Sequence, residues 1–87
     1  MTESIELVKL RGCKTEEEQL CKIGEEFGEV IEAFREYKRT GCSEHFKEEL
    51  IDLMQVSFTM LNKIGYTAED NIKHLRKMEV YKVTKNY

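Results

Sequence analysis

The sequence predicts an all-α protein, a helical bundle of three to four helices that is completed by oligomerisation. The chain contains no proline and is rich in Glu, Lys, Leu and Met, which all favour helices. Its apolar residues recur at helical spacing in segments that glycines separate. The 87 residues leave room for one domain, residues 1–87, near the small end of what a hydrophobic core stabilises unaided.

Two helices are expected in the first half of the chain. A short one over residues 4–10 ends before Gly12. Thr15 and Glu18 then have the spacing of a capping box, in which each side chain accepts a hydrogen bond from the other residue's backbone N–H. The long helix that begins there is expected to reach about Arg39, and the glycine two positions later ends it.

Two more helices are expected in the second half. Ser43 is placed to cap a helix that runs to Lys63 and stops at Gly65. Thr67 and Asp70 again have a threonine followed three residues later by an acid. A last helix is therefore expected to begin there and to reach about residue 82.

Apolar residues cover one face of the first long helix but most faces of the second. In the first they form a stripe about 100° wide, as a half-buried helix requires. The stripe consists of Leu20, Ile23, Phe27, Val30, Ile31 and Phe34. The second helix carries Phe46, Leu50, Ile51, Leu53, Met54, Val56, Phe58, Met60, Leu61 and Ile64. Because so short a chain cannot enclose such a helix, we expect a homodimer or homotetramer.

Composition and charge exclude several classes of function. The net charge of −3 argues against general attraction to nucleic acid or anionic membranes. The longest weakly charged stretch, residues 50–64, is shorter than the roughly 20 apolar residues of a membrane span. Two early glutamates argue against a signal peptide and for the cytoplasm. The three cysteines are expected to be reduced thiols, and Cys42-x-x-His45 is too small a set to predict a zinc site.

Two pairs of carboxylates, each pair three residues apart, carry the functional prediction. Glu26 and Glu29 lie in the first long helix, and Glu49 and Asp52 lie in the second. This spacing puts both members of a pair on one face of their helix, about a turn apart. The two pairs also take matching positions around their helices. Glu26 and Glu29 lie at about −100° and −160° from Phe27, and Glu49 and Asp52 lie at the same two angles from Leu50.

Antiparallel packing through Phe27 and Leu50 is expected to gather all four carboxylates at the rim of the core. Four neighbouring acids repel one another unless a cation compensates their charge. An all-oxygen set points to Mg²⁺, with Mn²⁺ as a substitute. The alternative is that such pairs arise by chance among seventeen acids and form solvated ion pairs. Asp52 argues against this alternative, because it is the only acid between Leu50 and Ile64.

The pattern E-E-x-x-E, then about twenty residues, then E-x-x-D resembles the MazG family of all-α nucleoside triphosphate pyrophosphohydrolases, relatives of the dimeric dUTPases and dCTP pyrophosphatases. Here it reads Glu25-Glu26-Phe27-Gly28-Glu29 and Glu49-Leu50-Ile51-Asp52, and the similarity covers about residues 18–82. The resemblance implies that the Mg²⁺ ligands are Glu26, Glu29, Glu49 and Asp52. It further implies that Glu25 supports these ligands or accepts a proton.

The reaction that the resemblance implies is hydrolysis of a nucleoside triphosphate between its α and β phosphates. Phosphates need fixed positive charge, and Lys22 lies four residues before Glu26 on the same edge of its helix. An ordinary ion pair between Lys22 and Glu26 is the alternative role. The family's late N-x-x-K-x-R run is similar to the segment here, with His74 where a lysine is usual. The phosphate contacts that it implies are Asn71, Lys73, Arg76 and Lys77.

Two other functions remain open from the sequence. Phosphoribosyl-ATP pyrophosphohydrolases have a similar helical fold and length, but they usually show a histidine shortly after the second acid motif, where this chain has Gln55-Val56-Ser57. A non-catalytic helical module, either a dimerising regulator or a nucleotide sensor, would use the same acids for salt bridges or weak metal binding. The preferred base cannot be read from the sequence.

Overall fold

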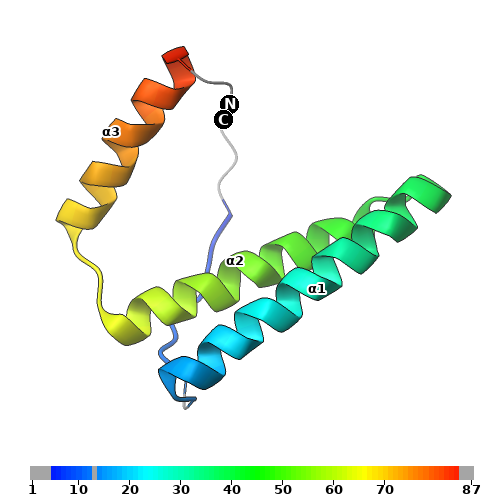
Figure 1. The fold of residues 1–87 in the computed structure, drawn as a ribbon, viewed down its shortest axis with the longest axis horizontal. Helices are drawn as coiled ribbons and strands as arrows, with labels where there is room; N and C mark the ends of the chain where they lie inside the picture. The colour runs from blue at the N-terminus through cyan, green and yellow to red at the C-terminus, as the bar shows by residue number, and fades with distance from the viewer. Residues whose placement is uncertain (1–4, 13, 85–87) are drawn as a thin grey trace.

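The computed structural model describes residues 5–12 and 14–84, and it confirms the all-α prediction. Three helices follow one another, α1 (Glu16–Thr40), α2 (Glu44–Ile64) and α3 (Ala68–Thr84) (Figure 1). The described residues form no strand. None of the described helices is both long enough and apolar enough to cross a membrane.

The boundaries of α1 follow the predicted capping signals. The N–H of Glu18 donates to Thr15 Oγ1 over 3.1 Å, and the N–H of Thr15 donates to Glu18 Oε1 over 2.9 Å. The hydrogen bond from the Thr15 N–H is the main reason why the pKa of the Glu18 carboxyl lies below its usual value. At the other end Gly41 takes the left-handed conformation, with φ of 78°, and its N–H donates to Tyr37 O. The capping box is therefore confirmed.

The boundaries of α2 and α3 also agree with those predicted from the sequence, but one of the predicted capping interactions is not formed. At the start of α3, the N–H of Asp70 donates to Thr67 Oγ1 and the N–H of Thr67 donates to Asp70 Oδ2. At the start of α2, Ser43 makes no capping hydrogen bond with its side chain, so that predicted cap is wrong. Gly65 ends α2 as expected.

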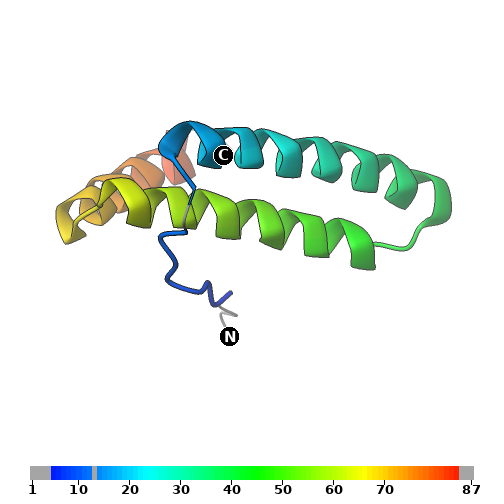
Figure 2. The same ribbon diagram turned by 90° about the horizontal axis from the view of Figure 1, so that it is seen from below.

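The short helix predicted over residues 4–10 is wrong, since residues 5–12 are not helical; Ser4 lies outside the described residues. This N-terminal segment instead crosses α2 (Figures 1 and 2). The side-chain amide of Gln55 binds both backbone groups of Val8: it accepts from the N–H and donates to the carbonyl, each over 2.8 Å. The backbone groups of Val8 that a helix would pair locally are thus bound by a side chain of α2.

Helices α1 and α2 lie side by side as an antiparallel hairpin, but not through the predicted face (Figure 2). Phe27 and Leu50 are 56% and 39% exposed, so packing through these two residues is wrong. The buried residues of α1 are Gln19, Glu26, Val30 and Ala33. This face lies about 90° around the helix from the apolar stripe. Glu26 therefore faces α2 directly, and most of the stripe stays exposed.

Helix α3 leaves the hairpin at a sharp angle after Gly65 (Figure 1). It packs along neither α1 nor α2, and none of its residues is buried. Among the described residues the only buried hydrophobic side chains are Val30 and Ala33. The single chain thus supplies three helices but only one packed pair.

Candidate metal centre

Three of the four predicted ligands converge between α1 and α2. Glu26, Glu49 and Asp52 each offer a carboxylate oxygen, and these oxygens lie within 4.8 Å of one another. Glu26 is only 6% exposed, because its position on α1 faces the partner helix, while Asp52 is exposed at the edge. The glutamate of α1 thus meets two acids that lie one turn apart on α2.

Two oxygens in this cluster are buried without a hydrogen-bond partner among the described residues. They are Glu26 Oε2 and Glu49 Oε2. The second oxygen of each carboxylate is held: Glu26 Oε1 lies 3.2 Å from Lys22 Nζ, and Glu49 Oε1 lies 3.1 Å from His45 Nε2. A buried carboxylate oxygen with no partner is costly, and a cation is the partner that three adjacent acids favour. These residues therefore fit a hard divalent cation with oxygen ligands.

The fourth predicted ligand, Glu29, lies outside this group. Its side chain is exposed, since a step of three residues places it farther from α2 than Glu26. Glu25 is also exposed and lies beside the cluster, with Oε2 3.6 Å from Lys22 Nζ. One chain thus brings three of the four acids together and places Glu25 at their rim.

Lys22 forms the ion pair that the sequence offered as its alternative role. Its ammonium contacts both Glu25 and Glu26. The hydrogen bond to Glu26 is the main cause of a raised pKa for Lys22. Because Lys22 contacts Oε1 of Glu26, the Oε2 atom of the same carboxylate remains available to a cation. A role for Lys22 in binding phosphate remains a prediction.

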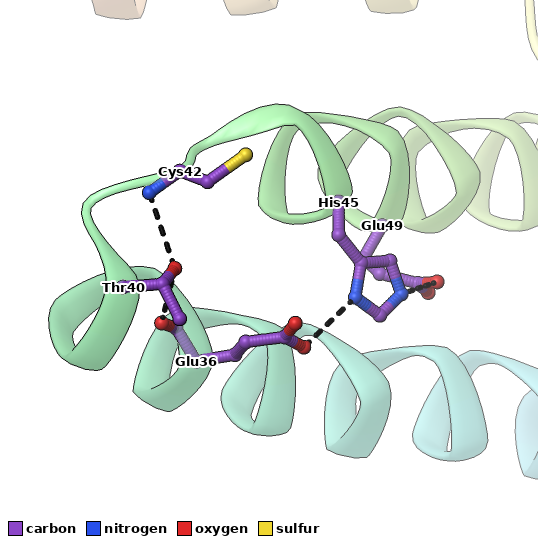
Figure 3. Close-up of polar contacts among 5 residues, drawn as sticks. All are labelled: Glu36, Thr40, Cys42, His45 and Glu49. Carbon is purple, nitrogen blue, oxygen red and sulfur yellow. Dashed lines mark hydrogen bonds and ion pairs between the residues drawn. The ribbon is translucent and has the colours of Figure 1, made fainter.

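His45 joins the two helices at the edge of the cluster (Figure 3). Its Nδ1 lies 3.4 Å from Glu36 Oε2 on α1, and its Nε2 lies 3.1 Å from Glu49 Oε1. The sequence interpretation missed this contact, although His45 precedes Glu49 by the four residues that place side chains on one helical face. His45 thus fixes one oxygen of Glu49 and leaves the other facing the cluster.

Cys42 does not join His45 in a zinc site. Figure 3 shows the thiol apart from the imidazole, and Cys42 does not belong to the cluster of described side chains that could hold a metal ion. Cys21 and Cys42 are free and exposed, whereas Cys13 lies outside the described residues.

The contacts of His45 predict a pH dependence of stability. Hydrogen bonding to Glu36, and then to Glu49, raises the pKa of His45 above its usual 6.5. Since the folded protein then holds the proton more tightly, the stabilisation is fully present below about pH 6.5 and is lost as the pH rises through the folded-state pKa. In metal-free protein, we expect the wild type to exceed His45→Gln in free energy of unfolding most at about pH 6, and the difference to shrink by about pH 8.

Urea denaturation of both proteins across this range measures the effect. His74→Gln is the matched control, because this imidazole is exposed on α3 and forms no ion pair with a described residue. A difference between wild type and His45→Gln that grows as the pH rises would contradict the assigned contacts.

The phosphate-binding residues predicted on α3 do not reach the acidic cluster within one chain. Asn71, Lys73, Arg76 and Lys77 are all exposed on a helix that packs along neither α1 nor α2. The ammonium of Lys77 lies over the ring of Tyr81, 5.6 Å from its centroid. Contact between these residues and the cluster therefore requires a second copy or a different placement of α3.

Comparison of the chain with models of known protein families, with curated protein sequences and with solved structures gives no match.

Proposed function

We propose that this protein is a Mg²⁺-dependent nucleoside triphosphate pyrophosphohydrolase. One observation carries the proposal: carboxylates from two consecutive helices converge, and two of their oxygens are buried with no hydrogen-bond partner in the described part of the chain. A cluster built only from carboxylates favours Mg²⁺ or Mn²⁺ over zinc, which prefers nitrogen and sulfur ligands. The pattern of the same acids in the sequence, E-E-x-x-E followed by E-x-x-D, supports a polyphosphate substrate.

In the proposed reaction, water adds to the α phosphorus and the bond between that phosphorus and the bridging oxygen breaks. The products are a nucleoside monophosphate and pyrophosphate. The bound cation supplies charge neutralisation on the phosphate oxygens and lowers the pKa of the attacking water. Glu26, Glu49 and Asp52 would hold the cation, and Glu25, whose exposed Oε2 lies 3.6 Å from Lys22 Nζ, would accept the proton of the water.

Lys22 has a second role in this proposal. With a cation bound to Glu26, the ion pair between Lys22 and Glu26 would weaken, and the ammonium of Lys22 would then be available to a phosphate oxygen. It lies at the rim of the cluster, next to Glu25, where a substrate phosphate would approach. Lys22 thus binds a carboxylate in the free protein and a phosphate in the complex.

The proposed enzyme is a homodimer or homotetramer. The apolar stripe of α1 remains largely uncovered, with Leu20, Phe27, Ile31 and Phe34 exposed. Helix α2 likewise exposes large apolar residues that a second hairpin would cover to form a four-helix bundle. A second copy also offers a route by which the cations of α3 approach an acidic cluster.

The test is incubation of the purified protein with a panel of nucleoside triphosphates and Mg²⁺, with chromatography of the products. We expect nucleoside monophosphate and pyrophosphate in equal amounts, no reaction in EDTA, and recovery with Mn²⁺. Phosphoribosyl-ATP is included in the panel, and its selective cleavage would favour the related pyrophosphohydrolase. Thermal stabilisation by nucleotides that are never consumed would overturn the enzyme proposal in favour of a nucleotide sensor.

A further inference from the structure

A second concave site lies at the corner between α2 and α3, away from the acidic cluster. The hollow has a volume of about 550 Å³, within the range of small-ligand pockets. The N-terminal segment, the end of α2 and the start of α3 each supply part of its wall. Its side chains include Lys9, Arg11, Asn62, Tyr66 and Asn71, and none of the described residues that line it is acidic.

The lining of this hollow is rich in groups that donate hydrogen bonds. Lys9 and Arg11 form no ion pair with any residue in the described ranges, so their charges lack a nearby counterion there. Asn62 is only 6% exposed, and its Nδ2 is buried with no hydrogen-bond partner among those residues. A buried donor without an acceptor is costly. Two unpaired cations beside such a donor favour an anionic ligand with several acceptor oxygens.

The segment that carries both cations is anchored on either side of them. Before Lys9, the backbone of Val8 is bound by the amide of Gln55. After Arg11, the carbonyl of Gly12 accepts a hydrogen bond from Lys63 Nζ over 3.4 Å. The backbone that carries the two cations is therefore fixed against α2 on both sides of them before any ligand binds, which lowers the entropy lost on binding.

Tyr66 adds a flat apolar surface to the same hollow. Its ring packs edge-on against Phe58, with the centroids 6.1 Å apart, yet the residue remains exposed. An exposed tyrosine ring is a surface on which a nucleobase stacks. The lining thus combines donors for a phosphate with a platform for a base.

The hollow is separate from the acidic cluster. Asn62 follows Asp52 by ten residues on α2, which corresponds to about 15 Å along the helix and roughly 80° around it. We propose that this corner hollow binds a nucleoside monophosphate without any metal. Its phosphate contacts Lys9 and Arg11, and its base lies against Tyr66.

The test is calorimetric titration of the full-length protein with AMP and with inorganic phosphate, both in EDTA so that no divalent cation is present. The double variant Lys9→Ser/Arg11→Ser should weaken AMP binding by roughly tenfold or more. Tyr66→Leu should weaken AMP several-fold and leave phosphate binding unchanged, which separates base stacking from phosphate contact.

The matched control is Lys38→Ser/Arg39→Ser, which removes the same charge from the last turn of α1. It should change AMP affinity less than twofold, as should Asp52→Asn in the acidic cluster. Equal weakening by the control pair would reduce the effect to net charge and overturn the proposal. Absence of AMP binding, loss of binding in Asp52→Asn, or tighter binding of an acidic peptide than of AMP would also overturn it. Failure here leaves the pyrophosphohydrolase proposal intact, because that activity is measured with Mg²⁺ at the other site.

Discussion

Addition of Mg²⁺ is expected to stabilise the wild-type protein strongly and to leave Glu26→Gln, Glu49→Gln and Asp52→Asn almost unchanged. At about 100 times the dissociation constant, a ligand that binds only the folded state adds about 2.7 kcal/mol to the free energy of unfolding. For a domain of this size that corresponds to a rise in Tm of roughly 10–20 °C. Each variant replaces an ionised carboxylate of the cluster by a neutral amide, which removes a charge that holds the cation.

Pyrophosphate release should fall with metal affinity. Mutation of a residue that merely supports a metal ligand lowers metal affinity or activity about 10–100-fold. Mutation of a ligand itself is therefore expected to lower the rate of pyrophosphate release at least about 100-fold. In EDTA we expect Glu26→Gln to lose little or no stability relative to the wild type. Because its buried Oε2 has no partner among the described residues, removal of the charge should change the free energy of unfolding by less than about 1 kcal/mol, or raise it.

Differential scanning fluorimetry at one fixed protein concentration, with Mg²⁺ or EDTA, measures both effects. Glu48→Gln is the matched control, since Glu48 is exposed, adjoins Glu49 and lies outside the cluster. Glu29→Gln distinguishes the sequence pattern, which includes Glu29 among the ligands, from the structure, which does not. The structure predicts that this variant loses less of the Mg²⁺-dependent rise in Tm than the three variants of the converging acids. The metal centre would be refuted by a Mg²⁺-dependent rise in Tm that survives in all three cluster variants.

The helix boundaries were predictable because local interactions determine them. Thr15 and Glu18 lie three residues apart and cap the start of α1 by bonding to each other. Their role can therefore be predicted from a short stretch of sequence. The N-terminal segment was not predictable in this way. Its conformation depends on Gln55, which binds Val8 across 47 residues of chain, and no local propensity reports such a contact.

The acidic cluster was predicted for a partly wrong reason. The sequence interpretation assumed that the most apolar faces meet, with Phe27 opposite Leu50, and that the acids gather at the rim. In the structure, α1 instead turns the face with Glu26, Val30 and Ala33 toward α2. The convergence of Glu26 with Glu49 and Asp52 is therefore central to the hairpin, and Glu29 is left outside.

The same rotation of α1 predicts how the protein assembles. If its exposed stripe packs against a second copy, Phe27→Glu is expected to dissociate the assembly. Full burial of one large apolar side chain contributes about 1.5–3 kcal/mol, and a symmetric dimer loses this contribution twice. The dimerisation constant should therefore weaken by about 100-fold or more. Sedimentation equilibrium of wild type and variant measures this change directly.

Val83→Glu is the matched control, because Val83 is an apolar residue that is 85% exposed near the end of α3, away from the stripe. It should leave the assembly intact. Dissociation of Phe27→Glu should also lower helicity and Tm, since the free chain buries only Val30 and Ala33 among its described hydrophobic residues. A wild-type protein that sediments as a monomer and still unfolds cooperatively would refute this arrangement. The hairpin would then be stabilised by contacts within one chain, such as the hydrogen bond that Gln19 Nε2 of α1 donates to Val56 O of α2 over 3.0 Å.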